Sequence, residues 1–181
     1  ILLGETNAAD LPNLEGILEE YGMQAADGYI ADPQRSYQGN YYYIFPELSV
    51  SGDMAEGLES QMVLLTNTHG MNVIDPSRDT IVTTPFITSS ADAYAVTEES
   101  QQQGTYVLGA TAVETISSEE DTEETAEDST QSSDSSEETD EKESRLTMIS
   151  AGSLIDQQIT DSFTQLANTQ LSMNAATANF D

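Results

Sequence analysis

The chain has 181 residues, about the length of one domain, and 33 acidic residues against four Lys or Arg give it a formal net charge of −29. This charge excludes nucleic acid as a partner and argues against direct contact with an anionic membrane surface, because both interactions need clusters of Lys and Arg. The chain contains no Cys, which excludes disulfides, thiolate catalysis and Cys-based zinc sites.

The ends of the sequence indicate a piece of a longer protein. The chain begins at "ILLGET", without Met and already inside an apolar run, and it ends at "NAATANFD". It contains no run of roughly 18 apolar residues that could span a membrane. We therefore expect any membrane anchor to lie outside this fragment.

The first strong pattern, after a short apolar run at residues 1–5, predicts a helix over residues 10–22. Asp10 is a suitable N-cap, Pro12 suits the first turn and Gly22 suits the C-terminal stop. Apolar residues recur at spacings of three and four, which places them on one helical face. These residues are Leu11, Leu14, Ile17, Leu18 and Tyr21.

Short strands and turns follow in the middle of the chain. Strands are predicted near residues 28–32 and 40–45, and a short helix near 51–61, where Asp53 and Glu56 resemble a capping box. The apolar run from Met62 predicts a buried strand. Residues 69–82 then read as turn, strand, turn and strand.

The last elements flank an acidic tract. Strands are predicted at Tyr106–Val113 and Arg145–Ser150, and a helix over residues 156–180 with apolar positions at Ile159, Phe163, Leu166 and Leu171. Between the strands, residues 117–144 hold 13 acidic residues and one Lys, so the remaining chain still carries 20 acidic residues against three Arg. Only about 37 residues follow the tract, too few for a second core. We therefore predict one domain, residues 1–181, with residues 117–144 as a low-complexity loop insertion at the tip of an antiparallel edge hairpin.

Strands that alternate with helices predict an α/β domain with a parallel sheet at its centre. The order of four segments also resembles a bacterial family, the extracytoplasmic auxiliary proteins of ABC transporters of the gliding-motility-associated type. "DLPNLEGILEEYGMQAADGYIADP" is similar to the family pattern "lpnLn.lL..yGi...dg.v.D", and "TTPFITSSADAYA" is similar to "Pll.TS..aw". "RLTMISAGSLIDQQ" resembles "rvvviGdsdFlsn", and "NTQLSMNAATANF" resembles "N..lflNalnwl".

The resemblance implies a flavodoxin-like or glutamine-amidotransferase-like layered sheet outside the membrane, anchored by helices that this fragment lacks. The first strands of that family, with the pattern "Gp...l...e...l..yl..GG", would precede Ile1, so the fragment would be a partial domain. Where the family often has an acidic "GDSDF" turn, this chain has "SAGSLID" at residues 150–156. That departure weakens any cation-binding role of the turn.

The candidate sites in the sequence each have a plainer interpretation. His69 is the only His, in "NTHGMN", and without a "GxSxG" motif a surface turn is the favoured interpretation over a catalytic base. The segments Ala31–Ser36 and Asp75–Thr80 hold Asp and Arg but read as ordinary turns. Tyr41–Tyr43 could form a sugar-stacking face, although core packing is favoured because side chains alternate along a strand. No EF-hand spacing is present, so no metal or cofactor site is assigned.

We therefore predict a non-catalytic extracytoplasmic accessory domain, with no catalytic, cofactor or metal residue assigned. It would lie on the outer face of a bacterial cell membrane and bind a transmembrane transporter subunit or another extracytoplasmic protein. One alternative is an extracellular glycan hydrolase that uses paired carboxylates, although 33 acidic residues do not nominate a pair. Another is a structural spacer.

Overall fold

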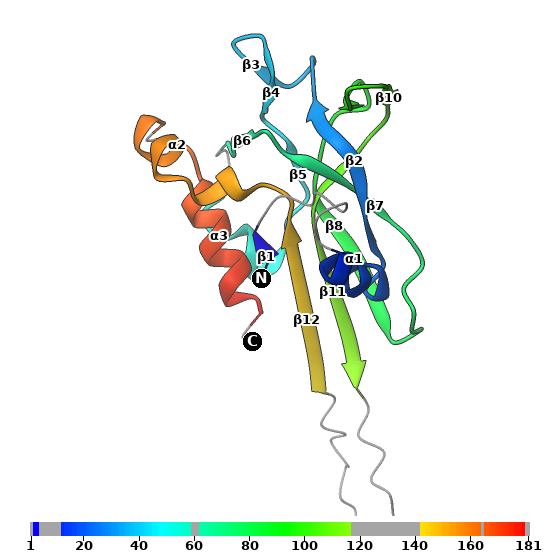
Figure 1. The fold of residues 1–181 in the computed structure, drawn as a ribbon. Coiled ribbons are helices and arrows are strands. Elements are labelled where there is room, and N and C mark those ends of the chain that lie inside the picture. Colours follow the sequence, from blue (N-terminus) through cyan, green and yellow to red (C-terminus); the bar gives the residue numbers. More distant parts are fainter. Residues whose placement is uncertain (1, 4–11, 59–61, 117–141, 164, 180–181) are drawn as a thin grey trace, which may run out of the picture.

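The computed structural model describes residues 2–3, 12–58, 62–116, 142–163 and 165–179, and these form a mostly β protein with a large sheet and a small one (Figure 1). The strands are β1 (Leu2–Leu3), β2 (Met23–Ala31), β3 (Ser36–Tyr37), β4 (Asn40–Ile44), β5 (Glu47–Leu48), β6 (Leu65–Thr66), β7 (His69–Val73), β8 (Ile81–Thr88), β9 (Tyr94–Val96), β10 (Gln101–Gln103), β11 (Val107–Ile116) and β12 (Lys142–Ile149). The helices are α1 (Pro12–Glu20), α2 (Gln157–Ser162) and α3 (Asn168–Thr177), with single 3-10 turns η2 (Gly52–Ala55) and η3 (Gly152–Ile155).

The predicted layered α/β fold is wrong. The large sheet has nine strands in the order β1-β12-β11-β7-β2-β9-β10, with β8 paired to both β11 and β5, and it curls into a half-barrel. Within the described residues, β1 and β12 are the one parallel strand pair in this sheet, and the other pairs are antiparallel. Strands β3, β4 and β6 form the small antiparallel sheet.

The position of the helices explains the wrong prediction. The regular helices lie near the two ends of the described chain, whereas β6 to β11 follow one another through turns with no α-helix among them. A parallel pair needs a crossover of a dozen or more residues, but antiparallel neighbours need only a short turn. The turn-rich spacing of residues 62–116 therefore favours the antiparallel arrangement.

The predicted hairpin around the acidic tract is confirmed in its pairing. Strands β11 and β12 are antiparallel in continuous register from Gly109 opposite Ile149 to Ile116 opposite Lys142. The prediction that this hairpin lies at the sheet edge is wrong, because β12 also pairs with β1 and β11 also pairs with β8. Residues 117–141 of the tract lie outside the described residues.

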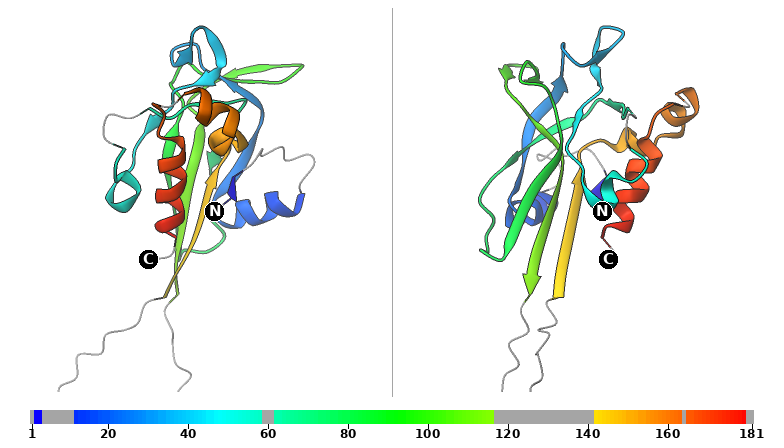
Figure 2. Two further views of the ribbon diagram at one scale, coloured as in Figure 1. Left: turned by 90° about the vertical axis from the view of Figure 1, so that its left-hand side faces the viewer. Right: turned by 180° about the vertical axis from the view of Figure 1, so that it is seen from behind.

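The sheet has a separate core on each face. Helix α3 packs on one face and α1 on the other, and Figure 2 shows them on opposite sides of the β11–β12 hairpin. Adjacent residues of β12 divide between these cores: Met148 joins the core under α1, whereas Ile149 joins the core under α3. This division follows from the alternation of side chains along a strand.

The predicted helix over residues 10–22 is confirmed as α1, with one exception on its apolar face. Leu18 is buried at 2% exposure, and Leu14 and Tyr21 are partly buried against the same core. Ile17 is 49% exposed, so its predicted packing is wrong. Gly22 ends the helix with φ +75°, a left-handed conformation that favours Gly; Asp10 and Leu11 lie outside the described residues.

Helix α3 is attached to the sheet through buried amides. The Asn168 Nδ2 donates to the Leu64 carbonyl at 2.8 Å, and its Oδ1 accepts from the Leu64 backbone N–H at 2.9 Å. The Asn168 side chain thereby satisfies the backbone N–H and C=O of Leu64, as a neighbouring strand would otherwise do. Asn174 Nδ2 donates in turn to the carbonyls of Met54 and Glu56.

Two finer predictions are wrong. The helix predicted over residues 156–180 is divided into α2 and α3, and the Asp156 side chain caps α2 by accepting from the Gln158 backbone N–H. The capping box at Asp53 is not formed, because Ser51 is the N-cap of η2 and makes no side-chain cap hydrogen bond.

Candidate functional site

A bulge in strand β2 creates the most distinctive local geometry in the described chain. Between the pairs Ala25–Met71 and Tyr29–His69, β2 contains two more residues than β7 does. Gly28 lies in this bulge with φ +85°, and a Cβ there would lie 2.3 Å from the Val96 carbonyl oxygen. Only Gly fits this position, and bulges of this kind redirect neighbouring groups at functional sites.

His69 lies opposite the bulge, and its predicted place in a surface turn is wrong. It is the first residue of β7 and only 4% exposed. Its Nδ1 lies 2.8 Å from the Gly28 carbonyl oxygen. A carbonyl oxygen can only accept, so Nδ1 carries a proton, and in the neutral ring Nε2 is then an acceptor. Nε2 is buried and has no hydrogen-bond partner among the described residues.

The Tyr29 ring covers His69. The two ring centroids are 4.4 Å apart and the planes are tilted by 38°. Tyr29 is itself 42% exposed, so its ring contacts the buried imidazole while part of the side chain reaches solvent.

A large open hollow of about 1390 Å³ surrounds these groups. The bulge of β2, the starts of β7 and α1, and the turn between β9 and β10 all contribute to its lining. Four carboxylates line it, those of Glu15, Asp27, Glu98 and Glu99, and its lining includes no Lys or Arg from the described residues. The hollow is therefore strongly acidic.

Local hydrogen bonds order the turn that carries two of these acids. Thr97 Oγ1 accepts from the backbone N–H groups of Glu99 and Ser100, and the Thr97 N–H donates to the Ser100 carbonyl at 2.9 Å. This fixes the backbone of residues 97–100 at the rim. The side chains of Glu98 and Glu99 are exposed there.

The three tyrosines of β4 are not core residues, so the predicted core packing is wrong. Tyr41 is 50% exposed, and Tyr42 and Tyr43 are only partly buried, whereas Ile44 is fully buried. Tyr42 lines the acidic hollow. Tyr29 and Tyr42 are thus both aromatic residues of its lining.

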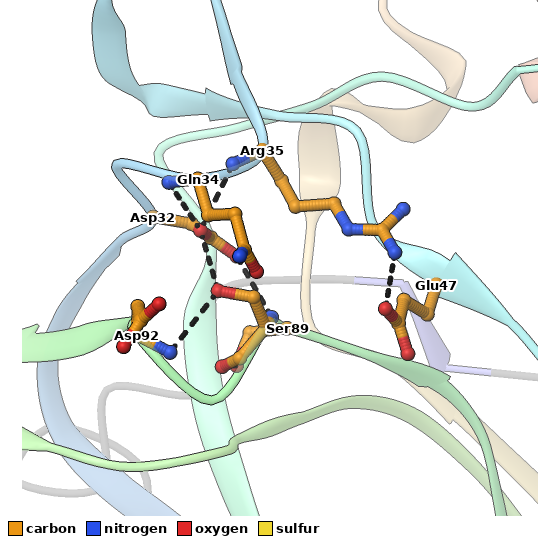
Figure 3. Close-up of polar contacts among 7 residues, drawn as sticks. Asp32, Gln34, Arg35, Glu47, Ser89 and Asp92 are labelled. Atoms are coloured by element: carbon orange, nitrogen blue, oxygen red, sulfur yellow. Dashed lines mark hydrogen bonds and ion pairs between the residues drawn. The ribbon is translucent and has the colours of Figure 1, made fainter.

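A second polar centre lies directly after β2, at Asp32 (Figure 3). Its side chain is fully buried. Oδ1 accepts from the backbone N–H groups of Gln34 and Arg35 at 3.0 and 3.1 Å and from Ser90 Oγ at 2.8 Å. Oδ2 accepts from the Ser90 N–H at 2.8 Å. Both carboxylate oxygens are thus occupied by donors from two separate loops.

The two Asp-Arg segments are turns, as predicted, and in neither does the Arg side chain form an ion pair with an Asp of its own segment. Arg35 pairs with Glu47 on β5 (Figure 3). Arg78 pairs with Glu114 of β11, with Nε 2.6 Å from the carboxylate. The hydrogen bond to Glu114 raises the pKa of the Arg78 guanidinium above its ordinary value. These two ion pairs attach the turn at Arg35 to strand β5 and the turn at Arg78 to strand β11.

The carboxylates that line the hollow differ from the one buried carboxylate of the described chain. Within the described residues, no group of three or more His, Asp or Glu side chains could hold a metal ion. Asp32 is the one buried carboxylate of the described chain, but it does not line the hollow, and its two oxygens accept four hydrogen bonds. Of the acids that line the hollow, Asp27, Glu98 and Glu99 are exposed and Glu15 is partly buried. An exposed carboxylate is suited to attract a cation.

Sequence reasoning missed both His69 and Asp32 as buried groups. One signal was available: an isolated Gly inside a strand pattern, as at Gly28, indicates a bulge or a close backbone approach. The partner across the bulge was not predictable from the sequence, because it depends on the pairing of β2 with β7.

No helix in the described part of the chain is both long and apolar enough to cross a membrane. Comparisons with protein-family models, with curated proteins and with solved structures gave no match to this chain.

Proposed function

We propose that this chain is a non-catalytic accessory domain of a membrane-anchored ABC-type transport system, which binds a ligand or partner on the extracytoplasmic side. The layered fold implied by the family resemblance is not the fold of the chain. Support for the proposal therefore comes from how the resembling segments meet.

The observation that carries the proposal is the contact between Asp32 and Ser90. Asp32 matches the last Asp of the first resembling pattern, and Ser90 lies in the second segment, 58 residues later. The two residues are joined by hydrogen bonds through both carboxylate oxygens. The Asp and the Ser that the family patterns mark at these two positions are therefore hydrogen-bonded to each other in the fold.

The other two resembling segments meet the same body of the protein through polar groups. Ser150 follows β12, and its carbonyl accepts from Thr68 Oγ1 at 2.6 Å, next to His69. Asn168 holds the last segment to Leu64. All four segments thus take part in a single folded unit that includes the acidic hollow.

The test is to purify the full parent protein from membranes and to identify its bound subunits by mass spectrometry. We expect a transmembrane transporter subunit in near-stoichiometric amount. A second arm screens the chain against generic ester, glycoside and peptide substrates, where we expect no turnover. Recovery without any transporter subunit, or turnover that is lost when one carboxylate of the hollow is replaced, would overturn the proposal.

A further inference from the structure

We infer that the acidic hollow at the β2 bulge binds a linear polyamine, an extended aliphatic chain with two or more ammonium groups. The inference rests on the proposed binding function and names the ligand class of the same site. It is carried by the juxtaposition of His69 Nε2, Tyr29 and four carboxylates around one open hollow.

The charge of the lining selects a cation. Glu15, Asp27, Glu98 and Glu99 contribute negative charge, and the lining holds no Lys or Arg from the described residues. An anionic ligand would be repelled, and the net charge of −29 adds to that repulsion.

The spacing of the acids selects an extended organic cation over a metal ion. A metal ion needs several oxygen or nitrogen ligands within about 2.6 Å of one point, and no such group occurs among the described residues. The acids instead come from α1, from the β2 bulge and from the β9–β10 turn. Carboxylates that come from separate elements suit an aliphatic ligand whose ammonium groups are also separated.

His69 supplies the specific contact. Its Nδ1 proton is committed to the Gly28 carbonyl, so Nε2 requires a donor, and an ammonium N–H is such a donor. His69 itself lines the hollow, beside the Tyr29 ring that contacts it. Tyr29 is 42% exposed, so its ring is available to a second ammonium or its methylene neighbours.

The direct experiment follows His69 by NMR, because it is the only His in the chain and its ring signals need no further assignment. Spermidine is titrated into the full chain at constant pH and about 0.15 M salt, where diffuse attraction to exposed acids is largely screened. We expect the Nε2 and Hε1 resonances to move saturably. Sorbitol and Ca²⁺ serve as the neutral-polyol and divalent-cation probes, and we expect neither to move them.

Variants measured by calorimetry separate the site from general negative charge. The double change Glu98→Gln with Glu99→Gln should weaken spermidine binding about fivefold to tenfold, as expected for two exposed charge contacts. The control, Asp75→Asn with Asp79→Asn, removes the same charge at residues that do not line the hollow and should weaken it less than about twofold. His69→Asn keeps a donor for the Gly28 carbonyl but removes Nε2, and should also weaken binding severalfold.

An unmoved His69 resonance at about 10 mM spermidine, or equal weakening by the two charge pairs, would overturn the inference. An equal response to sorbitol or Ca²⁺ would show that the ligand class is wrong. These outcomes concern the ligand alone. The transport assignment fails separately, through the subunit recovery and turnover assays described above.

Discussion

Asp32 and His69 are both buried polar side chains beside strand β2, and they differ in how completely their hydrogen bonds are formed. Asp32 accepts four hydrogen bonds from two loops, whereas His69 uses only Nδ1 and leaves Nε2 without a partner among the described residues. A buried group with all its bonds formed rigidifies a fold, and one with a bond missing costs free energy unless something binds it. The comparison therefore assigns Asp32 to stability and His69 to binding.

The largest effect is expected from Asp32→Ala. Removing the carboxylate leaves the buried Ser90 N–H and the donors of the Gln34 turn without an acceptor, and we expect a loss of about 4 kcal/mol in unfolding free energy. Urea denaturation followed by circular dichroism measures this. Asp92→Ala is the control, because Asp92 is exposed and should cost less than about 1 kcal/mol. Equal losses at the two positions would show that Asp32 is not a structural centre.

Asn168→Ala tests whether a buried amide that is hydrogen-bonded to the backbone stabilises the fold as the buried Asp32 carboxylate does. The change exposes the buried N–H and C=O of Leu64 to an environment without partners, and we expect a loss of about 3 kcal/mol. Thr169→Ala, on the exposed face of the same helix, should stay within about 0.5 kcal/mol of the parent. If Asn168→Ala unfolds with the parent's free energy, water replaces the amide at no cost, and α3 is held by apolar packing alone.

Leu18→Ala supplies an apolar reference for the two polar positions. Leu18 is 2% exposed between α1 and the sheet, and we expect a loss of about 2 to 3 kcal/mol in unfolding free energy. Ile17→Ala on the adjacent, 49% exposed position should cost less than about 1 kcal/mol. A thermal or urea unfolding series that ranks Ile17 above Leu18 would contradict the orientation of α1.

The smallest effect is expected from the acidic tract. Ile116 and Lys142 are paired opposite each other, so an Asn-Gly turn can replace residues 117–141 without a change of register. Because the replacement also removes like charges, we expect an unchanged or slightly raised unfolding midpoint in calorimetry. A midpoint lowered by many degrees would mean that the tract is part of the folded structure.

The parts that sequence reasoning predicted correctly are those fixed by local contacts. Leu18 follows from helical spacing, the left-handed Gly22 follows from the end of that pattern, and the segment at Asp32 follows from its turn-forming residues. The pairing of β11 with β12 was also predictable, because no helical pattern lies between them.

The parts that failed depend on partners distant in sequence. Whether β12 pairs with β11 alone or also with β1 cannot be determined from either strand's composition. The burial of His69 needs the bulge at Gly28 and the cover of Tyr29, both supplied by a strand some 40 residues earlier. The full set of hydrogen bonds to the Asp32 carboxylate likewise needs Ser90, 58 residues away.

The comparison between the two buried groups is tested most directly by a matched pair of substitutions, Asp32→Asn and His69→Asn, in one urea denaturation experiment. Asp32→Asn places an amide where Ser90 and the turn donate, and we expect a loss of about 3 kcal/mol in unfolding free energy. His69→Asn keeps the hydrogen bond to the Gly28 carbonyl and should cost only about 1 kcal/mol, mainly through lost packing against Tyr29. The reverse order, with His69→Asn the more damaging change, would contradict the assignment of Asp32 to stability and His69 to binding.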